Sequence, residues 1–343
     1  MPSSGSESRK IQVLGGSTYT VSIPKRWVAK LGLQPGDFVS LDLTSEGNLL
    51  MRSKSAHPPP EKKATVNPEG LLADDLQRRL IGLYLAGYNT IEVRCQPRID
   101  SEAMDVLREI PRKVSGLELV QETESRAVLE DIIDPTRFSI TMALERMYSL
   151  LRFALVRIVD GLLRRDGDQL TESFTRLQDV ERLSWIVLKQ QRMIVQAPSL
   201  ADRLRIDASD AVSYAICAQH LKSMAETCRD LIELVSSLPK LKVSRSALLE
   251  CVEIGNAVIS VCDSGLFAFT KNDLHAAGEC LFSLQRLEER MREVRDFVSK
   301  SETGKEGCGA CLSVSSILEV MRRVARQAAS VAEVAFQKAT AYR

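Results

Sequence analysis

The stretch that decides the fold is residues 9–37, RKIQVLGGSTYTVSIPKRWVAKLGLQPGD. Gly15 and Gly16 lie near its middle, where a turn can take positive φ at low cost. On both sides of these glycines apolar residues alternate with polar ones, namely Ile11, Val13, Tyr19, Val21 and Ile23. A period of two is typical of short, half-buried strands. The stretch therefore begins with a predicted β-hairpin.

A one-turn helix and a second hairpin are predicted to follow. Pro24 suits the start of a helix and Gly32 its end. Residues 34–37 form a turn before the alternating run at 39–43, and residues 45–48 form another turn before the apolar run at 49–51. Four strands this short bury too little apolar surface to be stable alone, so we expect a second copy of the chain to complete the fold.

Three motifs in this region are Gly-Gly-Ser-Thr-Tyr, Val-Ser-Ile-Pro-Lys-Arg-Trp and Leu-x-Pro-Gly-Asp. Together they resemble the AbrB/SpoVT/MazE family of swapped-hairpin DNA-binding domains. The resemblance implies that residues 1–52 form a dimeric β-barrel with a basic face that binds double-stranded DNA. The residues at matching positions are Arg9, Lys10, Gln12, Ser17, Thr18, Lys25 and Arg26. The alternative is a solvated barrel surface that serves only to form the homodimer.

Length and composition limit the remaining possibilities. A chain of 343 residues predicts about two or three domains. Its net charge is +1, so no overall basic field attracts nucleic acid, and DNA contacts must come from a local patch. We see no apolar run of membrane-spanning length and no signal-peptide core at the N-terminus, which predicts a cytoplasmic protein.

The middle of the chain predicts a linker and a small α/β segment. Residues 53–65 contain three consecutive prolines and are expected to form an extended spacer. Residues 66–135 then predict helix, strand, helix, strand, strand, with Asp100 as the cap of the second helix.

The remaining chain predicts six long helices with short connections. Apolar residues keep spacings of three and four from residue 138 to the end, as in the core of a helical bundle. The pattern of residues 163–183 recurs at 269–291, which indicates two tandem three-helix bundles, residues 136–240 and 241–343. The expected fold class is thus multi-domain and mainly α, with a small β-barrel at the N-terminus.

This repeat, together with RRLIGLYLAGYNTIEV at 78–93 and ALERMYSLL at 143–151, resembles archaeal proteins that join an AbrB-type domain to PhoU repeats. PhoU is a regulator of phosphate uptake. The resemblance implies a role in phosphate homeostasis. It also implies a phosphate transporter ATPase or a sensor kinase as the partner of the bundles.

PhoU proteins also hold divalent or ferric metal ions with acidic motifs, and those motifs are degraded here. The weak candidates that remain are Asp179, Glu181, Glu226 and Glu288. Lys222 and Arg326 stand within the motifs, and a cation at a ligand position repels a metal. We therefore expect Glu181, Glu226 and Glu288 to lie in ion pairs, and we assign no cofactor. His220 is expected to be exposed or hydrogen-bonded rather than a ligand.

Of the eight cysteines, Cys308 and Cys311 have ligand-like spacing. No second pair or histidine lies near them, so we interpret Cys308-Gly-Ala-Cys311 as part of a glycine-rich loop that happens to hold two thiols, with a zinc site as the alternative. The other cysteines that fall at apolar helical positions are expected to act as small hydrophobic residues.

Three functions compete at this stage. The first is a dimeric DNA-binding regulator whose bundles sense a signal or dock a partner. The second is a signalling adapter that acts on a phosphate transporter or kinase, with the barrel used only for dimerisation. The third, a metal-dependent enzyme, is disfavoured because the sequence shows no nucleophile–base pairing and its acidic motifs are degraded.

Overall fold

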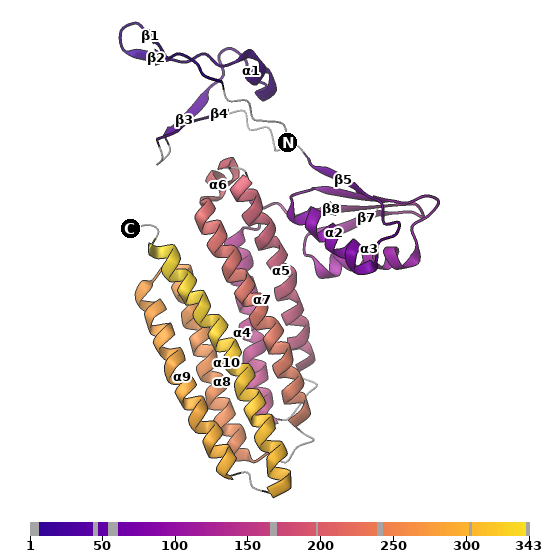
Figure 1. Ribbon diagram of the computed structural model, residues 1–343, viewed down its shortest axis with the longest axis vertical. Coiled ribbons are helices and arrows are strands. Elements are labelled where there is room, and N and C mark those ends of the chain that lie inside the picture. Colours follow the sequence, from indigo (N-terminus) through magenta and orange to yellow (C-terminus); the bar gives the residue numbers. More distant parts are fainter. Residues whose placement is uncertain are drawn as a thin grey trace. The chain divides into compact units, whose positions relative to one another are not determined.

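The computed structural model describes residues 7–43, 47–53, 61–164, 170–196, 198–238, 243–301 and 304–340 (Figure 1). The chain divides into two compact units, residues 1–60 and residues 61–343. We call the first unit the head. The second unit contains a small α/β layer followed by a long helical region, so the expected fold class, mainly α with a small β region at the N-terminus, is confirmed.

The head consists of two hairpins and a short helix. Strand β1 (Gln12–Leu14) pairs antiparallel with β2 (Thr18–Thr20), and β3 (Val39–Leu43) pairs antiparallel with β4 (Leu49–Ser53). Helix α1 (Lys25–Leu31) lies between the hairpins in the sequence. The order of elements is the one that the alternation predicts. Within this single chain the hairpins form two separate two-stranded sheets, so the strands do not close a barrel.

Glycines permit the tight connections of the head. Gly15 and Gly16 take φ of 63° and 86° in the turn between β1 and β2, and Gly32 takes 64° at the end of α1. These values lie in the left-handed region, which residues with a Cβ atom rarely occupy. Of the second hairpin's expected turn, residues 45–48, the first two lie outside the described residues.

The head exposes its apolar side chains instead of burying them. Pro24 is the one buried residue among the head residues whose burial is described. Tyr19 is 74% exposed and Leu43 is 77% exposed. The other large apolar side chains on the surface of the head are Ile11, Val13, Leu14, Val21, Trp27, Leu31, Phe38, Leu41 and Leu49. Because exposed apolar surface is unfavourable in water, the head needs a further apolar surface to cover it.

The α/β layer contains a four-stranded sheet in the order β5-β6-β8-β7. Strand β5 (Lys63–Val66) is parallel to β6 (Thr90–Arg94), and β8 (Arg126–Asp131) is antiparallel to both β6 and β7 (Leu117–Glu122). Strand β5 begins inside the predicted linker, residues 53–65, so that prediction was wrong from residue 63 onward. The residues of β5, Lys-Ala-Thr-Val, alternate polar and apolar over only four positions, which is too short a pattern to separate from a linker, and pairing with β6 fixes the strand.

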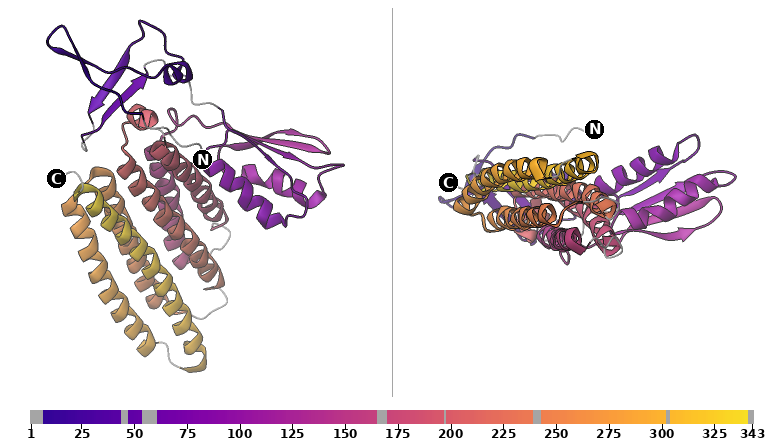
Figure 2. Two further views of the ribbon diagram at one scale, coloured as in Figure 1. Left: turned by 45° about the horizontal axis from the view of Figure 1, so that its top comes forward. Right: turned by 90° about the horizontal axis from the view of Figure 1, so that it is seen from below.

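Two helices cover one face of this sheet (Figure 2). They are α2 (Ala73–Leu85) and α3 (Ser101–Lys113), and Asp100 caps α3, as predicted, by accepting a hydrogen bond of 2.7 Å from the Ala103 backbone N–H. The core between sheet and helices is closed by fully buried residues such as Leu80 and Ile91.

The helical region has the six long helices that the sequence predicts, and one short helix, α6, that it does not. Their bounds are α4 (Ile140–Arg164), α5 (Leu170–Gln196), α6 (Pro198–Leu204), α7 (Ala208–Ser237), α8 (Arg245–Lys271), α9 (Leu274–Ser301) and α10 (Gly304–Thr340). We call α4, α5 and α7 bundle 1, and α8, α9 and α10 bundle 2. One apolar core runs continuously through both bundles. The bundles therefore form a single packed body, joined by contacts of α7 with α10 and of α4 with α8.

Glycine allows the closest helix crossing between α8 and α10. A Cβ atom on Gly265 would lie 2.5 Å from the backbone oxygen of Ala328, closer than such atoms can approach. Backbone cannot move aside as a flexible side chain can, so this crossing requires a glycine.

The cysteines of the helices are mostly core residues. Cys217, Cys228, Cys251, Cys262 and Cys280 are buried, as expected for small hydrophobic residues. Burial raises the pKa of Cys280 to about 11 and that of Cys251 to about 12. The predicted glycine-rich loop around Cys308 and Cys311 is wrong, since α10 begins at Gly304 and includes both positions. The side chain of Cys308 lies outside the described residues, and Cys311 is a free, half-buried thiol.

Helix α8 corrects a further expectation, that the chain has no apolar run of membrane-spanning length. By length and composition this helix could cross a membrane, since its most apolar window has a mean hydropathy of 1.3. In the structure 56% of that window is buried, and α8 packs against α4, α9 and α10. Its apolar character follows from its place in the core.

The α/β layer is joined to bundle 1 through helix α5. Lys189 of α5 forms an ion pair with Asp131 of β8. The two side chains are buried, with only 5% and 6% of their surface exposed. The Lys189 ammonium also lies 4.3 Å from the centre of the Tyr84 ring. Burial lowers the pKa of Lys189, and the Asp131 carboxylate acts in the opposite direction. Trp185, one turn earlier on α5, packs against the core of the α/β layer.

Candidate functional site

The head brings together two of the predicted DNA-binding residues through an acid that the sequence analysis did not select. Glu7 lies 2.5 Å from the Arg9 guanidinium and forms a second ion pair with Arg26 at the start of α1. Arg26 is 64% exposed and Arg9 is 43% exposed. Residues 7–32 contain five lysines and arginines and a single acidic residue, Glu7. A lone acid in a basic segment is the sequence signal that could have identified it.

The other predicted residues are exposed and lie apart from this trio. Lys10 precedes β1, and Lys25 opens α1. Gln12 pairs with Thr20 across the first hairpin, and its backbone oxygen accepts a hydrogen bond of 3.4 Å from the Thr20 hydroxyl. Ser17 lies in the turn, and Thr18 opens β2. Among the described residues, Glu7 links Arg9 to Arg26, and no ion pair joins the rest of the set to these two arginines.

Chemically, this surface can contact phosphate groups. Exposed guanidinium and ammonium groups form charge-assisted hydrogen bonds with phosphate oxygens. The turn adds backbone N–H groups, and no atom lies within 4 Å of a Cβ position on Gly15 or Gly16, so the turn stands open.

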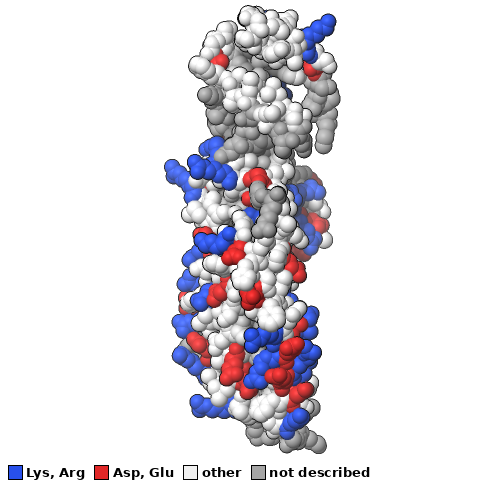
Figure 3. Space-filling model, turned by 90° about the vertical axis from the view of Figure 1, so that its left-hand side faces the viewer, with Lys and Arg blue, Asp and Glu red and all other residues white. Residues whose placement is uncertain are grey.

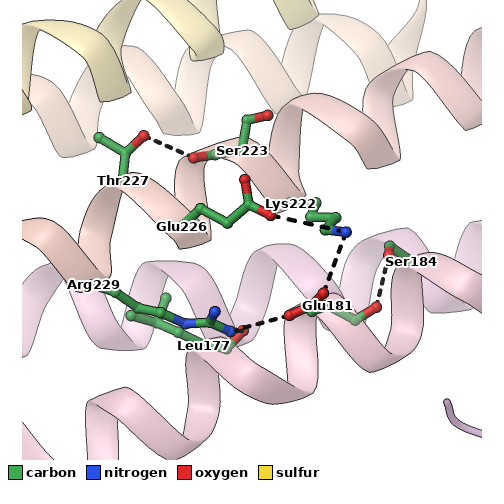
Figure 4. A network of polar contacts seen from close by, with 8 residues as sticks. All are labelled: Leu177, Glu181, Ser184, Lys222, Ser223, Glu226, Thr227 and Arg229. Carbon is green, nitrogen blue, oxygen red and sulfur yellow. Dashed lines mark hydrogen bonds and ion pairs between the residues drawn. The ribbon is translucent and has the colours of Figure 1, made fainter. Parts of the chain in front are cut away.

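A second candidate site, the acidic positions of bundle 1, contains one cation between two carboxylates and a second cation beside one of them (Figure 4). The Lys222 ammonium of α7 lies 3.3 Å from Glu181 of α5 and 3.8 Å from Glu226, one turn along α7. Arg229, also on α7, lies 3.5 Å from the other oxygen of Glu181. Glu181 therefore faces two positive charges, and Lys222 lies between two negative ones.

Aromatic rings support both cations. The Lys222 ammonium is 4.9 Å from the centre of the Trp185 ring, and the Arg229 guanidinium is 5.7 Å from that of Phe174. The side chains of Lys222 and Arg229 are 20% and 23% exposed, whereas that of Glu226 is 52% exposed. The positive charges are thus held deeper in the site than one of the carboxylates that balance them.

The other acidic positions are also paired with cations. Glu288 of α9 lies 2.6 Å from Arg326 of α10, and Asp179 lies 3.2 Å from Arg182. The expectation that Glu181, Glu226 and Glu288 lie in ion pairs is confirmed. His220 forms a hydrogen bond of 2.7 Å with Gln327, one of the two outcomes that we expected for it.

The residues present do not fit a bound metal ion. A hard cation needs several oxygen ligands that converge without a competing positive charge. Here an ammonium group already lies between the carboxylates that would converge. Among the residues that the structure describes, no group of three or more His, Cys, Asp or Glu side chains has a metal-binding arrangement.

Comparison with known proteins identifies the head. Residues 12–58 match the family described as "Antidote-toxin recognition MazE, bacterial antitoxin". The head is a MazE-type domain. Its match begins at β1 and includes both hairpins and α1.

Beyond the MazE-type domain, the chain is similar to two solved PhoU structures. One is PhoU from Pseudomonas aeruginosa, with 16% sequence identity, a TM-score of 0.48, and coverage of 61% of this chain and 98% of that one. The other is the phosphate transport system regulatory protein PhoU from Streptococcus pneumoniae, with 12% identity, a TM-score of 0.47, and coverage of 58% and 94%. No curated protein shows a significant sequence match to the chain.

Proposed function

We propose that this protein is a transcriptional regulator that binds double-stranded DNA as a dimer through its MazE-type head. The observation that carries the proposal is the head itself, a domain of this family with uncovered apolar surface and exposed basic side chains. The two features have different roles, dimerisation and DNA contact, and each is argued below.

The apolar surface of the head supports the proposed dimerisation. Four strands and one short helix expose eleven large apolar side chains and bury Pro24 alone among the head residues whose burial is described. A second copy offers the same apolar surface, and a two-fold interface would cover both copies at once. Interleaved hairpins would also supply the strand pairs that close the barrel, as the sequence resemblance implies.

Local charge supports the proposed DNA contact. The whole chain is close to neutral, but residues 7–32 hold five lysines and arginines against one glutamate. In a dimer this excess doubles and is drawn to the phosphate backbone. We assign phosphate contacts to Arg9, Lys10, Lys25 and Arg26, and contacts to bases or backbone to Gln12, Ser17 and Thr18 at the turn.

The helical region would act as the sensing or docking half of this cytoplasmic regulator. Its proposed link to phosphate homeostasis rests on the sequence resemblance of the repeats to PhoU. The partner that this implies is a phosphate transporter ATPase or a sensor kinase. Figure 3 shows one face of the helical region with charged side chains of both signs interspersed, whereas the head surface in that view is mainly uncharged.

The test is a titration of the full-length protein with duplex DNA from its own upstream region, at several salt concentrations. We expect affinity to fall steeply with salt, and Lys25→Ala with Arg26→Ala to lower the slope of log K against log salt by about 2 per protomer. The matched control is Arg78→Ala with Arg79→Ala, an exposed pair on α2 that removes the same charge. Weak binding that neither double variant changes would contradict the proposal.

The adapter is the second candidate, and one observation favours it. Glu7 already pairs with Arg9 and Arg26, which lowers the charge that this part of the head offers to DNA. If the head only dimerises, neutralising Lys25 and Arg26 will leave partner binding intact and DNA binding negligible throughout. A pull-down with the purified transporter ATPase, run on the same variants, separates the two functions.

A further inference from the structure

The acidic site of bundle 1 has a positive charge of its own. Lys222 lies 3.3 Å from Glu181 and 3.8 Å from Glu226, on two facing helices (Figure 4). A divalent ion that joined these helices would need to occupy the same gap, because it too must approach oxygens of both. The ammonium therefore stands where a metal ion would stand.

We propose that Lys222 is a built-in replacement for a metal ion. Its ammonium group joins α5 and α7 without a metal, and the site excludes divalent cations. The ammonium supplies one positive charge between two carboxylates. Arg229 supplies a second charge against Glu181 from the other side. Together they neutralise the pair of acids, and an incoming dication would meet repulsion from two fixed cations.

The surroundings of Lys222 favour a fixed cation. Its side chain is four-fifths buried, and the Trp185 ring lies 4.9 Å from the ammonium. Trp185 in turn packs against the core of the α/β layer, so Lys222 contributes to a junction of α5, α7 and that layer. A metal lost to a chelator would loosen such a junction, whereas a lysine cannot dissociate. The contact between α5 and α7 at this site is then independent of any metal.

The sequence positions also allow the reverse change to be tested. Lys222 and Glu226 are one turn apart on α7, so Lys222→Glu would place two carboxylates on the face that meets Glu181. Three converging carboxylates are a suitable ligand set for Mn²⁺. The proposal thus predicts that one substitution creates a metal site that the natural chain lacks.

The experiment is a Mn²⁺ titration of the full-length protein carrying Trp27→Phe, which leaves Trp185 as the single tryptophan. We expect no saturable change in Trp185 fluorescence for the natural Lys222, and saturable quenching with a Kd of roughly 10⁻⁴ M for Lys222→Glu. Lys222→Arg keeps the charge and should stay unresponsive. Lys222→Glu combined with Glu181→Gln should lose the new response.

A second measurement does not depend on the folding of any Lys222 variant. The melting temperature of the protein with Lys222 in place should be the same in 1 mM Mn²⁺ and in excess EDTA, to within about 1 °C. A stabilisation by Mn²⁺ that Glu181→Gln removes would overturn the proposal. Saturable binding by the natural site, or a folded Lys222→Glu protein without any response, would overturn it as well.

Discussion

The head and the second unit use their apolar residues in opposite ways. In the head, Leu43 is 77% exposed and Tyr19 is 74% exposed, with Pro24 alone buried among the residues whose burial is described. In the second unit one core extends through six long helices, and residues such as Leu151 and Phe269 are fully buried. The second unit thus buries an extensive apolar core within a single chain.

The difference indicates which part of the protein depends on a partner. Unlike the helices, the head can reach its final stability only when other apolar surface covers it. Conditions that favour association of two heads would therefore also favour the folded form that we propose to bind DNA. The helical unit, by contrast, should tolerate dilution without loss of structure.

The largest effect is expected from Leu41→Glu, in the middle of β3. If two heads share a two-fold interface, this change removes apolar burial and adds a charge in both copies. Each copy should then lose about 2 kcal/mol or more of the free energy of dimerisation. Dimerisation measured by sedimentation equilibrium should weaken at least about a thousandfold, since the two copies together lose about 4 kcal/mol. Leu72→Glu is the matched control, because Leu72 is 73% exposed but lies in the second unit. A dimer unaffected by Leu41→Glu would show that the head is not the interface.

The next effect concerns the junction between the α/β layer and α5. Lys189→Met leaves the Asp131 carboxylate buried without its partner and should cost about 3–5 kcal/mol in the free energy of unfolding. The double change Lys189→Met with Asp131→Leu removes both charges and should recover most of that loss. Urea unfolding of both proteins measures the difference. Equal destabilisation by the single and the double change would contradict the ion-pair account.

A smaller effect is expected at the crossing of α8 and α10. Gly265→Ala places a Cβ atom against the Ala328 backbone and should destabilise the protein by about 1–3 kcal/mol. Gly82→Ala in α2 is the control, because no atom lies within 4 Å of its Cβ position and alanine favours helix by about 1 kcal/mol. Thermal unfolding should therefore shift down for the first variant and up for the second. Two shifts of the same sign would refute the close packing.

The smallest effect is expected from Glu7→Gln in the head. The change frees Arg9 and Arg26 from their shared carboxylate and removes one negative charge from the basic region. DNA affinity should rise a few-fold, and the slope of log K against log salt should steepen by about 1 per protomer. Fluorescence anisotropy with a labelled duplex resolves such a change. A decrease in affinity would mean that Glu7 positions the arginines for DNA instead of competing with it.

Local patterns predicted most of the fold. Alternation around Gly15 and Gly16 predicted the first hairpin, and Asp100 predicted the start of α3. Spacings of three and four predicted the long helices. The failures occurred where distant residues decide the structure. Strand β5 exists because β6 offers it a partner, and residues 304–309 extend α10 despite their glycines.

The sites were predictable only in part, for the same reason. The degraded acidic motif indicated that Lys222 would meet a carboxylate, and the structure adds Arg229 and the Trp185 ring from other turns and helices. The pairing of Lys189 with Asp131 joins residues 58 positions apart, which no local pattern reveals. Glu7 lies in a polar stretch without periodicity, so its contact with Arg26 depends on how the head folds.

Sedimentation of the full-length protein with a fluorescent duplex, at low and at high salt, tests the central claim most directly. The absorbance of both components gives the number of chains per duplex. The account predicts two chains per duplex at low salt and release of the DNA at high salt. The Leu41→Glu protein should not bind the duplex at either salt concentration. A single chain per duplex, or a complex that the Leu41→Glu protein forms equally well, would contradict it.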